Sequence, residues 1–279
     1  MFKIFIILLS AASGVGFSFL FANNINNIPL LVLIGFGMMI ATLLSLIILF
    51  FVLLFIFTFF ENKNKERNYQ SVYFRKILIL MDKLLFALFS MKIHFSGREL
   101  LSRNEQYIIV CNHRSNVDSL VIDYYLKNFP LVFITKDSLF NVPFVGQIIH
   151  GCAYLKIYRD NIQSEFDMFS RANEMLIRSD KPLSIGVFPE GTRNKNNDVS
   201  ELLEFKAGTF RMAFKSKKPI VIMALKGTKE VNEKLLFKRH NIFLDILEVI
   251  EFDQYKDLSV NEISSYCQNK ISQYLKEKN

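Results

Sequence analysis

One histidine and one aspartate stand five positions apart in the stretch VCNHRSNVD, which covers residues 110–118. Residues five apart on a regular helix lie about 140° from each other around its axis, so these two side chains cannot meet within one helix. We expect His113 in a turn and Asp118 in the first turn of the following helix, because that arrangement brings the imidazole and the carboxylate together. The carboxylate would then fix the tautomer of the imidazole and support its protonated form. The pair is typical of a general base.

A purely structural role fits the same stretch. Ser115 precedes Asp118 by three residues, which is the spacing of a helix N-cap followed by an acidic residue in the first turn. Capping and catalysis can coexist, and the sequence leaves both open. The chain has four histidines. We assign structural or solvated roles to the other three, His94, His150 and His240, from their basic, apolar or turn-forming neighbours.

A second stretch, FPEGTR at residues 188–193, follows a short apolar run. Pro and Gly end a strand and let the backbone approach a ligand closely. Thr192 offers a hydroxyl, and Arg193 offers a planar set of N–H donors that suits phosphate. The stretch therefore predicts an anion site, although a turn of this composition can also simply end a strand.

Short apolar runs alternate with longer amphipathic ones over the second half of the chain. Strands are predicted at residues 107–111, 131–135, 153–157, 184–188, 220–225 and 242–249, and helices at 117–127, 163–178, 206–215 and 260–276. This alternation predicts an α/β fold with a mixed, mostly parallel sheet flanked by helices. Ligands of such sheets gather beyond the carboxyl ends of the strands, and His113, Arg159 and Glu190 each follow a predicted strand.

Residues 1–60 differ in composition from the rest of the chain. Their only charged side chain is Lys3, and two apolar runs, residues 4–22 and 28–60, flank an Asn-rich turn. Runs of this length are typical of membrane-crossing helices, so we expect an N-terminal transmembrane helical hairpin. A signal peptide is the alternative for the first run, since Lys3 precedes an apolar core and small residues follow. Basic residues after Phe60 predict that both termini lie in the cytoplasm.

Residues 61–96 are expected to form a charged connector and a membrane-associated amphipathic helix. Between residues 72 and 92 the polar side chains recur as one narrow stripe on an otherwise apolar helix. Such a helix can lie in the membrane interface or pack on the domain core. A third crossing is disfavoured because Asp82 and Lys83 would lie near its centre. The expected domains are an anchor (1–60), this connecting region (61–96) and a catalytic domain (97–279) on the cytoplasmic face of the membrane.

The charge of the chain limits its partners. A net charge of +8 beside a membrane suits anionic lipids and phosphorylated substrates. Nucleic acid is not expected, because the chain has no zinc-finger spacing, no RNA-binding aromatic signature and no basic tail. The three cysteines form no C-x-x-C pair, which predicts neither a disulfide framework nor a zinc site and agrees with a reducing compartment.

The order of three short motifs resembles the glycerolipid acyltransferase family. They are the N-H-x-x-x-x-D element, the F-P-E-G-T-R stretch and then the run FKAG at residues 205–208. The resemblance covers roughly residues 97–228, and members of this family often carry a preceding membrane anchor. It implies that His113 is the catalytic base and Asp118 its partner. It also implies acceptor-binding roles: Glu190 toward glycerol oxygens, Arg193 toward phosphate, with Gly191, Thr192 and Lys206 nearby.

Two stretches depart from the family pattern. The family's motif of a Gly, apolar residues and a basic residue that holds the phosphate is stretched here over residues 151–159, so Lys156 and Arg159 compete for that role. On a continuous strand these two side chains point to opposite faces, and we favour Arg159. The last family motif keeps Pro219 but has Met223 where a second Pro is expected, which bears on substrate preference.

The resemblance implies direct acyl transfer from a thioester, either acyl-CoA or acyl carrier protein, without a cofactor or metal. The expected acceptor is lysophosphatidic acid (1-acyl-glycerol 3-phosphate), and the product is phosphatidic acid for phospholipid synthesis. Another lysophospholipid or glycerol 3-phosphate is the alternative acceptor, and a non-catalytic membrane lipid-binding protein is the alternative of another class. A serine hydrolase is disfavoured because the chain has no G-x-S-x-G motif.

Overall fold

The computed structural model describes residues 2–21, 25, 27–63, 65–158, 162–178, 180–233 and 238–278. Its contacts divide the chain into two compact units, Met1–Glu61 and Asn62–Asn279. Each unit is described by itself.

The first unit is a pair of apolar helices, α1 (Phe2–Phe21) and α2 (Ile28–Thr58). Asn27 caps α2 by accepting a hydrogen bond from the N–H of Leu30. The helices pack antiparallel, since Ser13 Oγ lies 2.7 Å from Thr42 Oγ1 while Ser18 Oγ donates to the carbonyl of Leu31. Small residues and hydroxyl bonds of this kind are typical of helix pairs in lipid.

Length and composition single out one helix of this pair. Among the described residues, α2 alone is long and apolar enough to cross a membrane, whereas α1 offers the shorter apolar stretch Ile6–Phe21. The side chains of α2 are largely exposed, because α1 covers only part of its surface. The expected pair of apolar helices is therefore present, and whether both cross a membrane stays a prediction.

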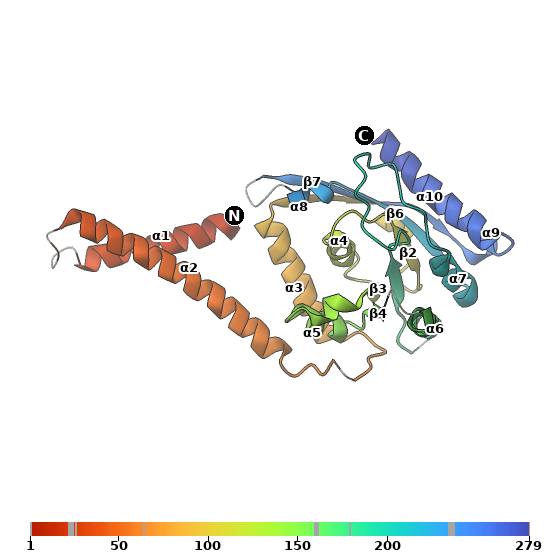
Figure 1. Ribbon diagram of the computed structural model, residues 1–279, viewed down its shortest axis with the longest axis horizontal. Coiled ribbons are helices and arrows are strands. Elements are labelled where there is room, and N and C mark those ends of the chain that lie inside the picture. Colours follow the sequence, from red (N-terminus) through yellow and green to blue (C-terminus); the bar gives the residue numbers. More distant parts are fainter. Residues whose placement is uncertain are drawn as a thin grey trace. The chain divides into compact units, whose positions relative to one another are not determined.

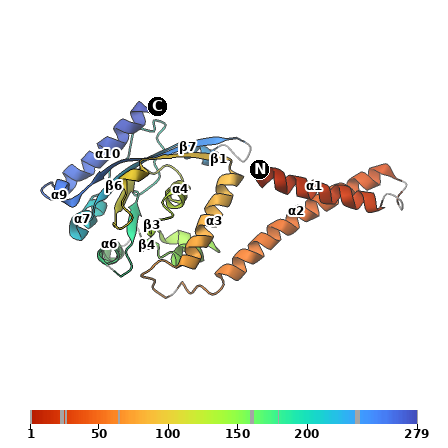
Figure 2. The same ribbon diagram turned by 180° about the vertical axis from the view of Figure 1, so that it is seen from behind.

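The second unit is built on a seven-stranded sheet with the order β1-β7-β6-β2-β5-β3-β4 (Figures 1 and 2). Its strands are β1 (Met91–Ser96), β2 (Ile108–Cys111), β3 (Leu131–Lys136), β4 (Leu155–Ile157), β5 (Ser184–Val187), β6 (Ile220–Lys226) and β7 (His240–Ile250). The run from β6 to β4 is parallel, while β7 is antiparallel to β6 and parallel to β1. This confirms the predicted mixed, mostly parallel sheet. The central strands β2 and β6 are almost continuously apolar and buried, as strands covered on both faces must be.

Helices cover both faces of the sheet, with α3, α4 and α5 on one side and α6, α7 and α10 on the other (Figure 1). The helices are α3 (Val72–Leu88), α4 (Asp118–Tyr125), α5 (Val145–Gly151), α6 (Ile162–Ile177), α7 (Ala207–Ser216), α8 (Lys229–Glu233), α9 (Phe252–Tyr255) and α10 (Val260–Glu277), with short 3-10 turns η1 (Arg98–Leu100) and η2 (Asp137–Asn141). A capping box of Ser259 and Glu262 opens α10. All three cysteines are free and buried.

The sequence did not predict β1. Residues 91 and 92 were assigned to the end of an amphipathic helix, but that helix ends at Leu88 and the chain turns at Ser90, whose φ is 51°. Residues 91–96 then pair with β7 at the edge of the sheet. Since β1 belongs to this sheet, residues 62–96 fold with the rest of the second unit.

Helix α3 buries two of the polar residues assigned to its polar stripe. Arg75 and Asp82 are 6% and 0% exposed, because α3 packs on α4, α5 and β1 with the face that carries them. Arg75 pairs there with the buried carboxylate of Asp123 on α4. The opposite face of α3 is exposed and largely apolar, with Val72, Tyr73, Leu80 and Leu88 beside Lys76 and Lys83. The core-packing alternative is therefore correct for one face of α3.

Asp82 makes the stability of this unit depend on pH. Burial, reinforced by the charge of Asp123, raises the pKa of Asp82 to about 9, whereas an unfolded aspartate titrates near pH 4 (about 3.9). Between these two values the folded protein binds one more proton than the unfolded chain, so the free energy of unfolding falls as pH rises.

Asp82→Asn replaces the protonated acid with a neutral side chain of the same shape and should flatten this dependence. The melting temperatures of both proteins are compared at pH 5 and at pH 8.5. We expect the decrease over this range to be several degrees larger for the wild type than for the variant, which corresponds to a difference on the order of 1–3 kcal/mol in the free energy of unfolding. Thermal unfolding of the detergent-solubilised protein measures it. Asp257→Asn, at an exposed carboxylate, is the control. If the melting temperatures of the wild type and of Asp82→Asn changed equally with pH, Asp82 would not be the group whose raised pKa causes the dependence.

Candidate functional site

The candidate site lies at the carboxyl edge of the parallel strands. The loop after β2 carries His113, and the loop after the adjacent strand β5 carries residues 188–206. Neighbouring parallel strands deliver their following loops to the same edge of a sheet, which is where open α/β sheets bind ligands.

His113 and Asp118 meet as predicted. His113 Nδ1 lies 2.8 Å from Asp118 Oδ2, with the imidazole 20% exposed and the carboxylate fully buried. With Nδ1–H donating to the carboxylate, Nε2 is the acceptor on the imidazole. The geometry therefore suits a base whose reactive nitrogen is Nε2.

The same carboxylate oxygen also shapes the turn. Asp118 Oδ2 accepts hydrogen bonds from the backbone N–H groups of Arg114, at 2.6 Å, and Ser115, at 2.8 Å. The second bond is half of the capping pattern that the spacing of Ser115 and Asp118 suggested. Asp118 therefore has two roles, because it holds the imidazole of His113 and also fixes the backbone of the turn.

Phe188 fixes the plane of the imidazole. The rings of His113 and Phe188 stack with centroids 4.2 Å apart and planes 15° apart, and Phe188 in turn stacks on Phe133 of β3 at 5.7 Å. His113 is thus held at Nδ1 by a hydrogen bond and on one face by an aromatic ring.

The carboxylate of Glu190 connects the loop after β2 with the loop after β5 by accepting hydrogen bonds from backbone N–H groups of both. Its Oε1 accepts the N–H of His113 at 2.7 Å and its Oε2 accepts the N–H of Leu203 at 2.9 Å. The side chain is 3% exposed, and burial raises its pKa while the two N–H donors act in the opposite direction. Both oxygens are thus engaged by the protein itself. The expected contact of Glu190 with glycerol oxygens stays a prediction, and the structure favours a bracing role.

Two asparagines that the sequence interpretation missed support the same loop. The buried amide of Asn112 bonds both the N–H and the carbonyl of Leu225, so it extends the β2–β6 pairing past the end of β2. Asn194, also buried, donates its N–H to the carbonyl of His113 at 2.7 Å. For Asn112 the only signal in the sequence was a polar residue directly after a buried strand, which does not reveal the backbone groups that it bonds, and the backbone N–H of Asn194 gave no signal.

The last three residues of the FPEGTR turn are partly or fully exposed. Gly191 has a φ of 68°, which favours glycine, and a Cβ there would lie 2.7 Å from Cε of Lys206. Lys206 is exposed and precedes α7, and its side chain lies over this turn. Thr192 and Arg193 are exposed. The turn thus presents two cations, Arg193 and Lys206, beside the loop that Glu190 ties to His113.

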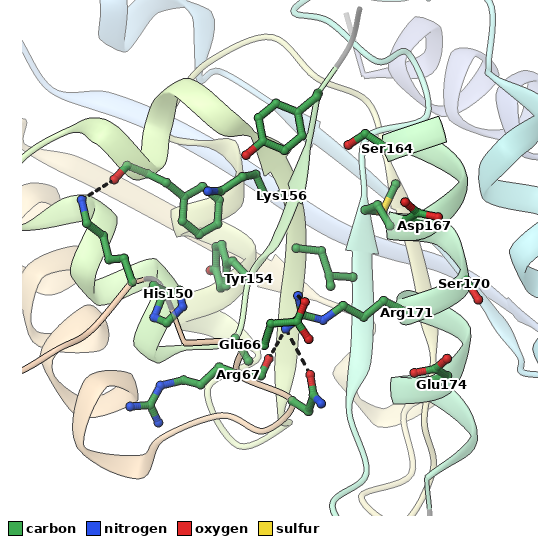
Figure 3. Close-up of a pocket in the computed structure, with 17 residues that line it drawn as sticks. Glu66, Arg67, His150, Tyr154, Lys156, Ser164, Asp167, Ser170, Arg171 and Glu174 are labelled. Atoms are coloured by element: carbon green, nitrogen blue, oxygen red, sulfur yellow. Dashed lines mark hydrogen bonds and ion pairs between the residues drawn. The ribbon is translucent and has the colours of Figure 1, made fainter. Parts of the chain in front are cut away.

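Two basic residues of the stretched motif, Lys156 and Arg159, are candidates for binding the phosphate. Arg159 lies outside the described residues. Lys156, on β4, places its ammonium over the rings of Phe140 and Tyr158, at 4.9 and 5.7 Å from their centroids. It lines a groove of about 520 Å³ between the connector, β4 and α6 (Figure 3). His113 does not line this groove.

Within the part of the chain that the structure describes, no group of three His, Cys, Asp or Glu side chains is placed to hold a metal ion.

Comparison with known proteins shows a similarity to one family and a shared fold. Residues 92–226 match the family model described as Acyltransferase. The 1-acyl-sn-glycerol-3-phosphate acyltransferase of Haemophilus influenzae is 25% identical over 193 residues, 69% of this chain and 78% of that protein. The Escherichia coli protein of the same name is 28% identical over 172 residues, 61% of this chain and 67% of that protein.

A solved structure shares the fold. The crystal structure of the 1-acyl-sn-glycerophosphate (LPA) acyltransferase from Thermotoga maritima matches with a TM-score of 0.58 and 22% identity, over 74% of this chain and 80% of that one. The motifs, the sheet and the family model agree with one another. Over residues 92–226 the chain is therefore similar to the acyltransferase family, and its fold is that of the solved acyltransferase structure.

Proposed function

We propose that this protein transfers an acyl chain from a thioester to the free hydroxyl of 1-acyl-sn-glycerol 3-phosphate and so forms phosphatidic acid. The observation that carries the proposal is the imidazole of His113, which is bonded at Nδ1 to the buried Asp118 and stacked on Phe188. The names of the relatives supply the substrate class. The acyltransferase domain supplies the reaction class.

In the proposed reaction, Nε2 of His113 removes the proton from the acceptor hydroxyl while the oxygen attacks the thioester carbonyl. The C–S bond then breaks, and the imidazolium returns the proton to the leaving thiolate. Asp118 stabilises the positive charge that develops on the imidazole between these steps. A base of this kind contributes about 10²- to 10⁴-fold to the rate, and positioning of the two substrates supplies much of the rest.

The phosphate of the acceptor is expected at the FPEGTR turn. Arg193 and Lys206 are exposed cations there, and Gly191 allows close approach to the backbone. A guanidinium can bind phosphate through two parallel N–H bonds, and an ammonium adds a point charge. This arrangement supports acceptor binding by Arg193, Lys206 and Thr192.

The membrane supplies the second part of the proposal. We expect α1 and α2 to cross the bilayer as a hairpin, with the acyltransferase domain on the cytoplasmic side. The exposed apolar face of α3, with Lys76 and Lys83 beside it, is suited to the interfacial zone of an anionic membrane. The acyl donor would be acyl-CoA or acyl carrier protein, and the reaction as written needs no cofactor.

The proposed function is tested by acyl transfer from a labelled acyl thioester in membranes that contain the protein. We expect lysophosphatidic acid to be acylated in preference to lysophosphatidylcholine and glycerol 3-phosphate. Preference for another lysolipid would replace the acceptor while keeping the chemistry. Thioester loss without any acylated acceptor would contradict acyl transfer itself.

Asp118→Asn should lower kcat by about 10²- to 10⁴-fold. A neutral amide cannot stabilise the imidazolium, and an NH₂ group that donates to Nδ1 favours the tautomer whose proton is on Nε2, which cannot act as the base. Steady-state rates with lysophosphatidic acid measure this loss. Asp118 also shapes the turn, so thermal unfolding of the same preparation must show a folded protein, and Asp253→Asn, at an exposed carboxylate, serves as control. A folded Asp118→Asn enzyme with near-normal kcat would exclude this role.

Arg193→Ala should raise the KM for lysophosphatidic acid about tenfold and leave kcat nearly unchanged, since it removes a charged hydrogen bond that the ground state already makes. Lys195→Ala removes another exposed cation two residues away and should leave both constants unaltered. If Arg193→Ala also left the KM unchanged, Arg193 would not bind the phosphate.

A further inference from the structure

The groove beside β4 contains cations that the acceptor site does not use. Lys63 of the connector donates to the carbonyl of Phe140 at 2.9 Å, and the ammonium of Lys156 lies over the ring of the same residue. Both ammoniums are therefore gathered around Phe140. Among the described residues, neither has a carboxylate within ion-pair distance.

Two of the three carboxylates that line the groove, Glu66 and Glu174, lie away from this end. Figure 3 shows Lys156, Ser164 and Asp167 in its upper half and Glu66, Arg67 and Glu174 in its lower half. Arg171 lies in between, where its guanidinium bonds the carbonyl of Arg67 and approaches Glu66. Around Phe140 the groove thus presents two ammoniums, and none of the described carboxylates pairs with either.

Strand register gives the separation between the strand that carries Lys156 and the strand that precedes His113. Val110 is level with Val187 across β2 and β5, Phe133 with Gly186 across β5 and β3, and Lys156 with Thr135 across β3 and β4. These pairings place Lys156 level with Cys111, two residues before His113. Three strand spacings separate β2 from β4, which amounts to about 14 Å.

This separation distinguishes the two substrates of the proposed reaction. The reacting hydroxyl of lysophosphatidic acid is joined to its phosphate by a link shorter than two residues of backbone, less than about 7 Å. This link is much shorter than the separation of the two strands, so the strand geometry favours a ligand with a longer link between its reacting atom and its phosphate. The thioester of an acyl donor is joined to the phosphate of its pantetheine arm by a chain with two amides, comparable to about four residues, which span about 14 Å when extended.

We propose that the Phe140 end of this groove, formed by Lys63 and Lys156, binds the phosphate of the phosphopantetheine arm of the acyl donor. This inference rests on the proposed function. It assigns the acceptor phosphate to Arg193 and Lys206 and the donor phosphate to the groove, so the two anionic substrates approach His113 from separate cationic sites. The arm phosphate is common to acyl-CoA and acyl carrier protein, and either donor fits the groove.

The test compares donors with and without this phosphate. Lys156→Gln should raise the KM for acyl-CoA and for acyl-4′-phosphopantetheine about tenfold, the loss expected for one charged hydrogen bond. It should leave unchanged both the KM for acyl-pantetheine, which lacks the phosphate, and the KM for lysophosphatidic acid. Lys63→Gln should act in the same direction. Lys127→Gln is the matched control, because its ammonium also lies 4.9 Å from a ring centroid, that of Tyr124, outside the groove.

Three outcomes would overturn the inference. A higher KM for lysophosphatidic acid in Lys156→Gln, with the donor KM unchanged, would assign the groove to the acceptor. An effect with acyl-CoA but not with acyl-4′-phosphopantetheine would assign it to the nucleotide phosphates. Equal donor KM values for Lys156→Gln and Lys127→Gln would show that it binds no donor phosphate.

Direct binding separates this inference from the proposed function. Titration of the full-length protein with CoA should show about tenfold weaker binding for Lys156→Gln than for Lys127→Gln. CoA binding with that difference, in a protein that acylates no acceptor, would contradict the proposed function and support the groove. Acyl transfer together with equal CoA affinity in the two variants would support the proposed function and contradict the role of the groove.

Discussion

The candidate site depends on one buried oxygen, Oδ2 of Asp118. It accepts hydrogen bonds from the imidazole of His113 and from the N–H groups of Arg114 and Ser115. Hydrogen bonds to a charged group contribute about 1.5–3 kcal/mol each, so this oxygen holds both the turn and the orientation of the ring. Asp118 opens α4, and α4 is tied to α3 by the buried pair of Asp123 and Arg75. The position of His113 therefore depends on packing that extends well beyond its own loop.

Local patterns predicted most of the sheet and the central pair of the site. Apolar runs bounded by turn residues gave six of the seven strands, because strands buried on both faces have few polar residues. The contact of His113 with Asp118 was predicted from their spacing, because helix geometry excludes a contact within a single helix and a turn followed by a helix brings the two side chains together. These features are encoded within a few consecutive residues, which makes them accessible to sequence reasoning.

What the sequence did not reveal depends on residues far apart in the chain. Glu190 was expected to face the substrate, but its carboxylate is engaged by the N–H of His113 and of Leu203. The edge strand β1 pairs with β7, which lies at the other end of the domain sequence, and its short alternating pattern was taken for the end of a helix. Arg75 and Asp82 share one line along α3, and only the packing of α4 shows that this line faces inward.

The most direct measurement of the central claim is phosphatidic acid formation by His113→Ala in membranes, from a labelled acyl thioester and lysophosphatidic acid. If His113 removes the proton from the acceptor, kcat should fall by at least about 10²-fold while the protein stays folded and the KM values for both substrates change little. Substantial acyl transfer by a folded His113→Ala protein would contradict the assignment of His113 as the base.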